Sequence, residues 1–469
     1  MTARTRLGLT LALGGLVIVL DTTITIVAVP VLAEEFDASL AVLQWTTTAY
    51  LLALVTTLPL AAWLASRFGA GRTYVAAMLV FAVGSLAAAC AWDPLSLITA
   101  RVLQGLGGGV INPLGMAIAM AGLPANQRGR MAAFLGLPVL VGPLVGPLVA
   151  GALIDTVSWR AIFLITVPPA LAAAWLVSRW APADRPTERL RLDLGGSALL
   201  VPGAVAVVYA VSNPGASDSV RLALGVGGAV LMAAFVLRSL GHATPLLRVR
   251  LLADPVFASG LVVLVLFGAA YFGSMLLMPT YVQVTRGDSA LMAGALGVPG
   301  GLAAGLGIQV ATRLVDRLPP RRIVASGLVL AALAFAGLTA VLRTDTSYAV
   351  LAAFGALLGL GSGAVILPTM TAATRHFDGP DLASAASIMG LLQQLASAFG
   401  IAGITALFAG LAPLDAAATD LVDAQRLTQL VPLALIVTAL AVALTRLRNP
   451  TKEVTDELEP DRTALAERG

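Results

Sequence analysis

Charged and chemically reactive residues are scarce in this sequence. Only 12% of its 469 residues are charged, whereas about a quarter are charged in ordinary soluble proteins. The single lysine, Lys452, lies in a polar tail, so the chain has no phosphate-binding G-x-x-x-x-G-K-[ST] loop, and any pumping must use an ion gradient or a separate ATPase. The single cysteine, Cys90, excludes an intrachain disulfide, and the two histidines, His242 and His376, lie in predicted loops and form no metal cluster.

Long apolar segments dominate instead. Hydrophobic residues make up 58% of the chain, and the mean hydropathy is +0.92. The apolar runs of about 20 to 28 residues match a hydrocarbon core of roughly 30 Å and lack the alternation of outer-membrane strands. The first run follows Arg4 and Arg6, as in a signal peptide, but it continues without a cleavage site, so we expect it to remain as a helix. The sequence thus predicts an all-α polytopic membrane protein.

Fourteen spans are predicted, each ended by proline, glycine or charge, at residues 7–32, 42–66, 72–91, 95–122, 130–154, 160–180, 194–212, 220–240, 256–284, 290–314, 322–342, 348–374, 382–411 and 428–446. With the N-terminus inside, the basic residues alternate as the positive-inside rule requires. The predicted outer loops contain only Arg160, Arg221, Arg286, Arg343 and Arg426. This pattern predicts that both termini are cytoplasmic, and it makes the net charge of +4 a topology signal, not a sign of nucleic-acid binding.

Two long polar inner loops, at 181–193 and 241–255, bracket one pair of spans. This arrangement predicts an N-terminal six-helix bundle (1–180), a linker with two inserted helices (181–255), a C-terminal six-helix bundle (256–446) and a polar cytoplasmic tail (447–469).

Two opposite charges lie deep inside predicted spans. At a rise of 1.5 Å per residue, Asp21 is roughly 14 Å and Arg101 roughly 10 Å below the outer surface. Ionised groups at such depth are costly and by default mark ion or substrate pathways, and a buried charge normally needs a partner. We therefore expect the two to meet, either in proton or substrate coupling or as a static pair. Helical spacing places Gln104, Gly105, Gly108 and Asn112 on the face of Arg101.

The fifth span carries glycine and proline at short intervals. Gly142, Gly146 and Ala150 recur every four residues, which lets a neighbouring helix approach closely. Pro143 and Pro147 each remove a backbone N–H, so a bend is predicted. Taken alone, this pattern is typical of ordinary packing between membrane helices.

Together, the motifs resemble those of the 14-spanner drug:proton antiporters of the major facilitator superfamily. The matching stretches are Asp21-Thr22-Thr23-Ile24 with Ala28-Val29-Pro30, Arg101-x-x-Gln104-Gly105, Gly146-Pro147-x-x-Ala150-Gly151, Trp159-Arg160-x-Ile162-Phe163, Tyr281-Val282-Gln283, Arg313-Leu314-Val315-Asp316-Arg317 and Gln394-Leu395-x-Ser397-x-x-Gly400. Their order and spacing match too, over about residues 10–446.

The resemblance implies two pseudo-symmetric bundles around a central cavity that opens alternately to each side, and export driven by inward proton flow. By matching position, it assigns proton and cation recognition to Asp21 and coupling to Arg101. It assigns the direction of antiport to the bent helix with Gly142, Pro143, Gly146, Pro147 and Gly151. No cofactor is implied beyond the proton gradient.

The loop between spans 2 and 3 departs from the superfamily pattern G-x-L-a-D-r-x-G-r. Ser66 stands at the position of the acid, so this loop lacks the charged latch that an Asp would form, while Arg67, Gly69 and Arg72 remain as its gating residues.

Polar, aromatic and Met side chains on several spans are candidates for the substrate pocket. An aromatic and Met lining suits a large amphipathic or cationic compound, although the same spacing is also typical of helix packing. The candidates are Thr25, Gln44, Tyr50, Gln104, Asn112, Tyr271, Met275, Met278, Gln393 and Gln394.

These observations predict a proton-coupled exporter of small lipophilic or cationic compounds, in which substrate and proton compete for Asp21. We expect a monomer in the plasma (inner) membrane of a bacterium, with the lipid bilayer, protons and the substrate as its partners. A dedicated exporter or flippase of one metabolite, lipid or siderophore remains open, because substrates diverge within one fold. A membrane-embedded sensor or enzyme finds no support, since no His, Cys or carboxylate cluster gathers within the spans. An ion channel is not supported either, because the sequence contains no repeated filter loop and no ring of charges.

Overall fold

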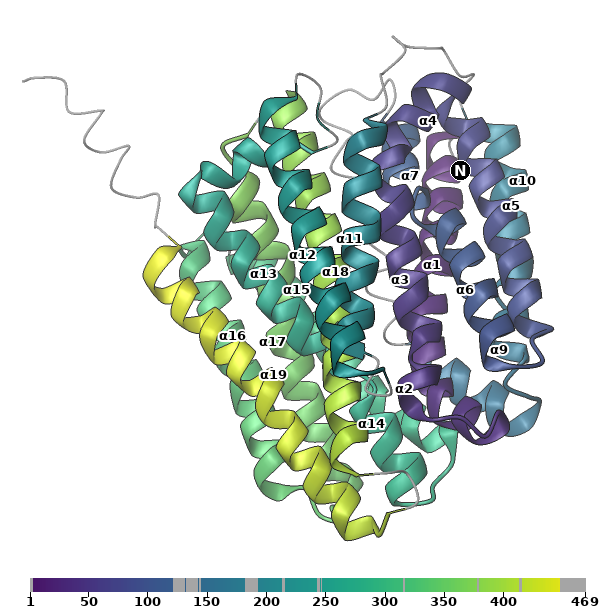
Figure 1. Cartoon of the computed structure of the whole chain (residues 1–469), viewed down its shortest axis with the longest axis vertical. Helices are drawn as coiled ribbons and strands as arrows, with labels where there is room; N and C mark the ends of the chain where they lie inside the picture. The colour runs from purple at the N-terminus through teal and green to yellow at the C-terminus, as the bar shows by residue number, and fades with distance from the viewer. Residues whose placement is uncertain are drawn as a thin grey trace, which may run out of the picture.

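In the computed structural model, the described residues form helices joined by turns and short loops, and none of these residues lies in a strand (Figure 1). The structure describes residues 3–120, 131, 142, 145–181, 193–212, 216–242, 245, 247–314, 317–377, 379–412 and 416–447.

The first half of the chain comprises α1 (Ala3–Glu35), α2 (Leu40–Leu43), α3 (Trp45–Thr57), the 3₁₀ turn η1 (Leu58–Leu60), α4 (Ala61–Phe68), α5 (Ala70–Ala89), α6 (Pro94–Gly108), α7 (Ile111–Met120), a helix at Val145–Thr156, α9 (Ala161–Leu164), α10 (Val167–Trp180), α11 (Leu194–Ser212) and α12 (Asp218–Gly241). The second half comprises η2 (Val249–Ala253), α13 (Pro255–Ser274), α14 (Leu277–Thr280), the π-helical turn η3 (Tyr281–Thr285), α15 (Ala290–Leu314), α16 (Pro320–Val341), α17 (Tyr348–Thr374), α18 (Gly379–Leu411) and α19 (Ala418–Arg446).

Within these ranges, thirteen helical segments are long and apolar enough to cross a membrane. They coincide with thirteen of the predicted spans. The remaining one, 130–154, falls mostly outside the described residues, which contain the shorter apolar helix Val145–Thr156 at its end. The count of fourteen spans therefore stays a prediction.

The helices gather into two groups (Figure 1). One contains α1, α3–α7, α9 and α10, and the other contains α13 and α15–α19, with α11 and α12 between them in this view. Helix α11 contacts α3 in the first group and α18 in the second. This grouping is compatible with the predicted domain boundaries, which stay a prediction.

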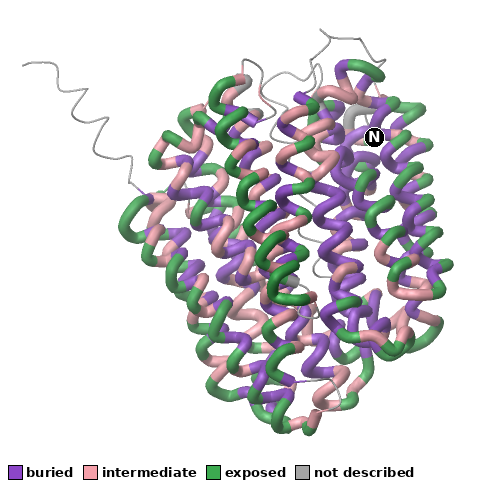
Figure 2. The backbone as a smooth tube through the Cα atoms, viewed as in Figure 1, coloured by how far each residue is buried: buried purple, intermediate pink, exposed green. Residues whose placement is uncertain are grey.

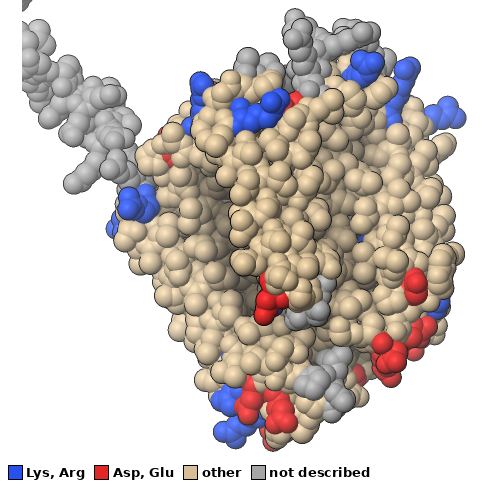
Figure 3. Space-filling model, in the orientation of Figure 1, with Lys and Arg blue, Asp and Glu red and all other residues tan. Residues whose placement is uncertain are grey.

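Burial differs sharply between the helices (Figure 2). Buried positions fill 72% of the most apolar window of α1 but only 11% of that of α12, so α12 lies at the periphery. Lys and Arg side chains gather mainly along the end of the molecule where the chain begins, and Asp and Glu mainly toward the opposite end (Figure 3). The basic end is the end that the predicted orientation assigns to the cytoplasm.

The last span begins earlier than predicted. We expected it at residue 428, but α19 starts at Ala418. Two of the polar residues that resembled a loop bond to neighbouring helices, and Gln425 is also fully buried. The Gln425 side chain donates to the Leu277 carbonyl at 3.2 Å, and the Arg426 guanidinium donates to the Thr339 carbonyl at 3.0 Å. Hydropathy alone ends a span where such polar residues begin, so the prediction was wrong by about three turns.

A capping box fixes the start of α6, two turns before Arg101. The Ser96 N–H donates to the Asp93 carboxylate at 2.7 Å, and the Ser96 hydroxyl accepts from the Asp93 N–H at 3.2 Å. Hydrogen bonds from the Ser96 side chain and backbone hold the pKa of the Asp93 carboxyl below its usual range. The cap thereby satisfies orphan donors of α6 and sets the register of the helix that carries Arg101.

Candidate functional site

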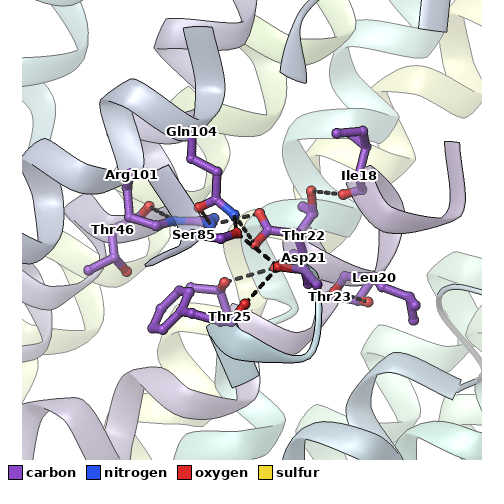
Figure 4. A network of polar contacts seen from close by, with 12 residues as sticks. Ile18, Leu20, Asp21, Thr22, Thr23, Thr25, Thr46, Ser85, Arg101 and Gln104 are labelled. Atoms are coloured by element: carbon purple, nitrogen blue, oxygen red, sulfur yellow. Dashed lines mark hydrogen bonds and ion pairs between the residues drawn. The ribbon is translucent and has the colours of Figure 1, made fainter. Parts of the chain in front are cut away.

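A buried polar cluster joins α1 to α6 in the middle of the first group of helices (Figure 4). The Arg101 guanidinium donates from Nη1 to Asp21 Oδ2 at 2.6 Å, and Gln104 Nε2 donates to Asp21 Oδ1 at 2.7 Å. Asp21 is 1% exposed, and Arg101 and Gln104 are fully buried. Both oxygens of this carboxylate are therefore held by α6, and the two deep charges are in contact.

A second layer of contacts fixes the two α6 side chains. Arg101 Nε donates to the Thr46 carbonyl of α3 at 3.0 Å, and its Nη1 also donates to Gln104 Oε1. Gln104 Nε2 further donates to the Ser85 hydroxyl of α5 at 2.6 Å, and Ser85 lies 2.8 Å from the Thr166 hydroxyl. The cluster thus connects four helices, and only one guanidinium nitrogen, Arg101 Nη2, lacks an acceptor among the described residues.

Glycines bring these helices close enough for the short contacts. A Cβ atom at Gly105 would lie 2.5 Å from the Tyr50 carbonyl oxygen, and one at Gly84 would lie 2.6 Å from the Gln104 backbone nitrogen. Because real Cβ atoms do not approach so closely, only glycine allows α3 and α5 to pack against α6 at this depth.

Tyr50 forms an aromatic wall beside the guanidinium. The Arg101 Cζ atom lies 4.2 Å from the Tyr50 ring centroid and 5.8 Å from that of Phe163. A ring face stabilises a desolvated cation, by about 2 kcal/mol in favourable cases. Arg101 therefore keeps favourable contacts besides its bond to Asp21.

The other predicted pocket residues of the first half have different surroundings. The Thr25 hydroxyl donates to the Asp21 backbone carbonyl at 2.8 Å, within α1. Gln44 is buried and donates to the Ala402 carbonyl of α18 at 3.4 Å, which links the two groups of helices.

Asn112 does not join the cluster, contrary to our expectation. The prediction assumed one continuous helix, but a turn at Gly109 and Val110 separates α6 from α7. The helical face that carries Arg101 is interrupted there, and Asn112 is exposed on α7.

Tyr271, Met275 and Met278 line one cavity of about 170 Å³ in the second group of helices. Its walls come from the helix Val145–Thr156 and from α13, α14, α15, α16, α17 and α19, and they are mostly apolar. The Gln429 side chain supplies a polar group, and its Oε1 accepts from the Thr339 hydroxyl at 3.1 Å. Gln393 and Gln394 are half-buried on α18 and are not among the described residues that line this cavity.

The glycine and proline helix packs between the cluster and the cavity. A Cβ atom at Gly146 would lie 2.1 Å from the Thr23 hydroxyl of α1, and Pro147 borders the cavity. Gly142 accepts a hydrogen bond from the Thr23 hydroxyl at 3.4 Å. Pro143 lies outside the described residues, so the predicted bend stays a prediction.

Several contacts between the two groups of helices lie near one end of the molecule, which the predicted orientation assigns to the outer side. Asp155 accepts from the backbone N–H groups of Ala290 and Leu291, at 3.2 and 2.8 Å, and so caps α15. Gln283 donates to the Val27 carbonyl of α1 at 3.1 Å. A Cβ atom at Gly151 would lie 2.3 Å from the Ala290 carbonyl oxygen. These contacts hold the two groups together at this end.

The sequence analysis missed Asp155 and Ser85. Ser85 gave a weak signal as a polar residue within a span, whereas Asp155 resembles an ordinary acid at the end of a helix. Its acceptor role depends on α15, 135 residues away, and no local pattern shows that contact.

The predicted gating loop lies between α4 and α5. Gly69 has a φ of 92°, a conformation that favours glycine, and forms the corner between the two helices. The Thr73 hydroxyl donates to the Gly69 carbonyl at 2.7 Å and closes this corner. Arg67 and Arg72 are both exposed.

A family model described as "Major Facilitator Superfamily" matches residues 11–401 and 302–467. The chain is 34% identical to a "Multidrug resistance protein B homolog" of Mycobacterium tuberculosis, over 81% of this chain and 72% of that protein. It is 33% identical to "Puromycin resistance protein pur8" of Streptomyces alboniger, over 82% and 78%. It is 28% identical to "Lincomycin resistance protein LmrB" of Listeria innocua, over 81% of each.

Solved structures share the fold at low sequence identity. A crystal structure of a D-xylose-proton symporter superposes with a TM-score of 0.69 at 15% identity, over 96% of this chain and 99% of that one. An inward-open conformation of the xylose transporter XylE from E. coli gives a TM-score of 0.65 at 16% identity, over 96% and 98%. At such low sequence identities, these structural similarities show only that the fold is shared.

Proposed function

The chain belongs to the major facilitator superfamily of membrane transporters, and from this premise we propose that it exports small lipophilic or cationic compounds in exchange for protons. The relatives named for multidrug, puromycin and lincomycin resistance support efflux. We further propose that it works as a monomer in the plasma membrane of a bacterium.

The buried carboxylate of Asp21 carries the proposal of proton coupling. Among the described residues, Asp193 is the other buried acid, and it caps α11 at that helix's end. Asp21 instead lies in the middle of α1, paired with Arg101. A charged carboxylate at that depth is energetically costly, and such residues by default mark ion or substrate pathways.

The cluster provides a way to exchange a proton without leaving a bare cation. In the structure, Asp21 and Arg101 form a neutral pair. When a proton binds Asp21, the carboxyl becomes neutral, and Arg101 keeps the Thr46 carbonyl, Gln104 Oε1 and the Tyr50 ring as partners. The protonated site then carries one more positive charge than the unprotonated site. This difference biases the equilibrium between the state open to the inside and the state open to the outside.

We place the substrate in the cavity beside Tyr271, Met275 and Met278, apart from Asp21. None of the described residues that line this cavity belongs to the polar cluster. The two sites share the helix of Gly146 and Pro147, which touches α1 at Thr23, two residues from Asp21, and borders the cavity at Pro147. Proton binding and substrate binding are therefore coupled through a common helix rather than by competition for one carboxylate.

A vesicle assay tests this function. The purified protein is reconstituted into proteoliposomes with an acidic lumen, and ethidium is added outside. Ethidium is a permanent cation, so acid trapping of a weak base does not contribute. We expect ethidium to accumulate as protons leave, and a protonophore to abolish this. Ethidium accumulation that does not depend on the pH gradient, or that equals the level in protein-free vesicles, would contradict the proposal.

A cavity-filling substitution tests the substrate site. Gly355 lines the cavity, and a Cβ atom there would have only the Leu296 carbonyl oxygen within 4 Å, at 3.9 Å. Gly355→Leu therefore places a side chain in the cavity, and we expect KM for ethidium to rise about tenfold, the equivalent of roughly 1.4 kcal/mol of binding. Gly410→Leu, at an exposed position of α18 with no atom near its Cβ, is the control and should leave KM unchanged. Equal KM values in all three proteins would exclude this cavity as the substrate site.

A further inference from the structure

A groove on the surface of the first group of helices combines basic and apolar walls. It has a volume of about 800 Å³ and lies where the α4–α5 corner meets α6. We call it the α4–α6 groove. It is separate from the polar cluster and from the cavity lined by Tyr271, since the described residues lining it belong to neither.

One part of the groove is basic. Arg67 and Arg72 flank Gly69 in the corner and line the groove with exposed side chains. Within the described ranges, no carboxylate forms an ion pair with Arg67. The corner lies at the same end of the molecule as the N-terminus (Figure 1), the end that the positive-inside rule assigns to the cytoplasm.

The rest of the groove is apolar and faces outward. Val80 of α5 is 37% exposed, Leu106 of α6 is 36% exposed, and Phe68 beside the corner is 52% exposed. Exposed apolar residues within the expected hydrocarbon region contact lipid. The groove therefore runs from a cationic end at the expected membrane surface into the expected hydrocarbon region.

Small residues form the floor of the groove. A Cβ atom at Gly107 would lie 2.6 Å from both the Ala77 carbonyl oxygen and the Phe81 nitrogen, so α5 and α6 meet backbone to backbone. Ala76, Ala77 and Gly107 all line the groove. With such short side chains between two helices, the surface stays hollow, and an acyl chain can lie in it.

We propose that the α4–α6 groove binds an anionic glycerophospholipid of the inner leaflet. The headgroup phosphate lies between Arg67 and Arg72, and one acyl chain runs along Ala76, Val80 and Leu106. Charge complementarity selects this occupant, because guanidinium groups donate to phosphate oxygens and basic pockets between membrane helices on the cytoplasmic side suit anionic headgroups. This inference requires the predicted orientation but does not depend on the transport activity.

Trp63 provides a local reporter. Its ring lies 6.2 Å, centroid to centroid, from that of Phe68, which lines the groove. The protein is placed in phosphatidylcholine nanodiscs that contain a minor fraction of either brominated phosphatidylglycerol or brominated phosphatidylcholine. Subtracting the signal of the Trp63→Phe variant isolates the quenching of Trp63 from that of the other five tryptophans. We expect at least twofold stronger quenching of Trp63 by the phosphatidylglycerol.

The double variant Arg67→Gln/Arg72→Gln should lose this preference. The matched control is Arg321→Gln/Arg322→Gln, a basic pair at the start of α16 on the same end of the molecule, which should keep it. Gel filtration and far-UV circular dichroism verify that each variant is folded. Added inorganic phosphate should not displace the lipid, because it lacks the acyl chain.

Three outcomes would overturn the proposal. They are equal quenching by the two lipids in the unmodified protein, a preference that survives in Arg67→Gln/Arg72→Gln, and a preference that disappears when the protein is diluted to one copy per nanodisc. The last result would identify a second protein copy, rather than a lipid, as part of the site.

Discussion

Replacing Asp21 by Asn is expected to reduce pH-driven accumulation of ethidium in proteoliposomes by about two orders of magnitude, the lower range for removing a positioned proton-transfer group. Asn has nearly the same shape, but it does not bind and release a proton at neutral pH. It also offers one acceptor oxygen where Arg101 and Gln104 each donate to a separate carboxylate oxygen. The measurement is the initial rate of ethidium accumulation as a function of the imposed pH difference.

Exchange at equal pH separates coupling from substrate binding. If the substrate site is the cavity beside Tyr271, exchange of ethidium inside for ethidium outside should persist in Asp21→Asn, because it needs no net proton transfer. Loss of this exchange in a correctly folded variant would mean that the cation binds Asp21 directly, as the sequence alone led us to expect. Unchanged pH-driven transport would refute the coupling role of Asp21.

Replacing Arg101 by Met is expected to lower the free energy of unfolding by about 3–5 kcal/mol, because the Asp21 charge is then buried without its partner. The double variant Asp21→Asn/Arg101→Met removes both charges and should recover most of this loss, since replacing a whole buried ion pair is often nearly neutral. Unfolding of the purified proteins in detergent, followed by circular dichroism, provides the four free energies of the cycle.

The same cycle distinguishes a static pair from a coupling pair. We expect the double variant to be stable and still unable to use a pH gradient. A double variant that recovers both stability and pH-driven transport would show that the pair only fixes packing. An Arg101→Met protein as stable as the unmodified one would contradict the contact itself.

The membrane spans could be predicted because each depends on the apolar character of about twenty consecutive residues. Predicted and observed bounds agree within two or three residues at most ends, for example 290–314 for α15 and 348–374 for α17. The prediction failed where burial compensates for polarity. In α19, Gln425 is fully buried and bonded to the Leu277 carbonyl of α14, which hydropathy does not detect.

The sequence by itself determined the membrane class, the family resemblance and the need for a partner at Asp21. A carboxylate within a long apolar run is costly, and Arg101 was the one clear deep charge of opposite sign. These conclusions depend on local composition and on the energy of a single buried charge, so a linear pattern contains them.

Only the tertiary structure decided which groups complete the cluster and where the cavity lies. Ser85 reaches Gln104, and Pro147 borders the cavity, because each helix has one particular rotation about its own axis. That rotation is set by close contacts at glycines such as Gly105 and Gly146, whose partners are far away in the chain. The interrupted helix at Gly109 shows the same dependence, since one turn there moved Asn112 off the predicted face. Close approach between distant segments is a property of the packed helices, and no window of sequence contains it.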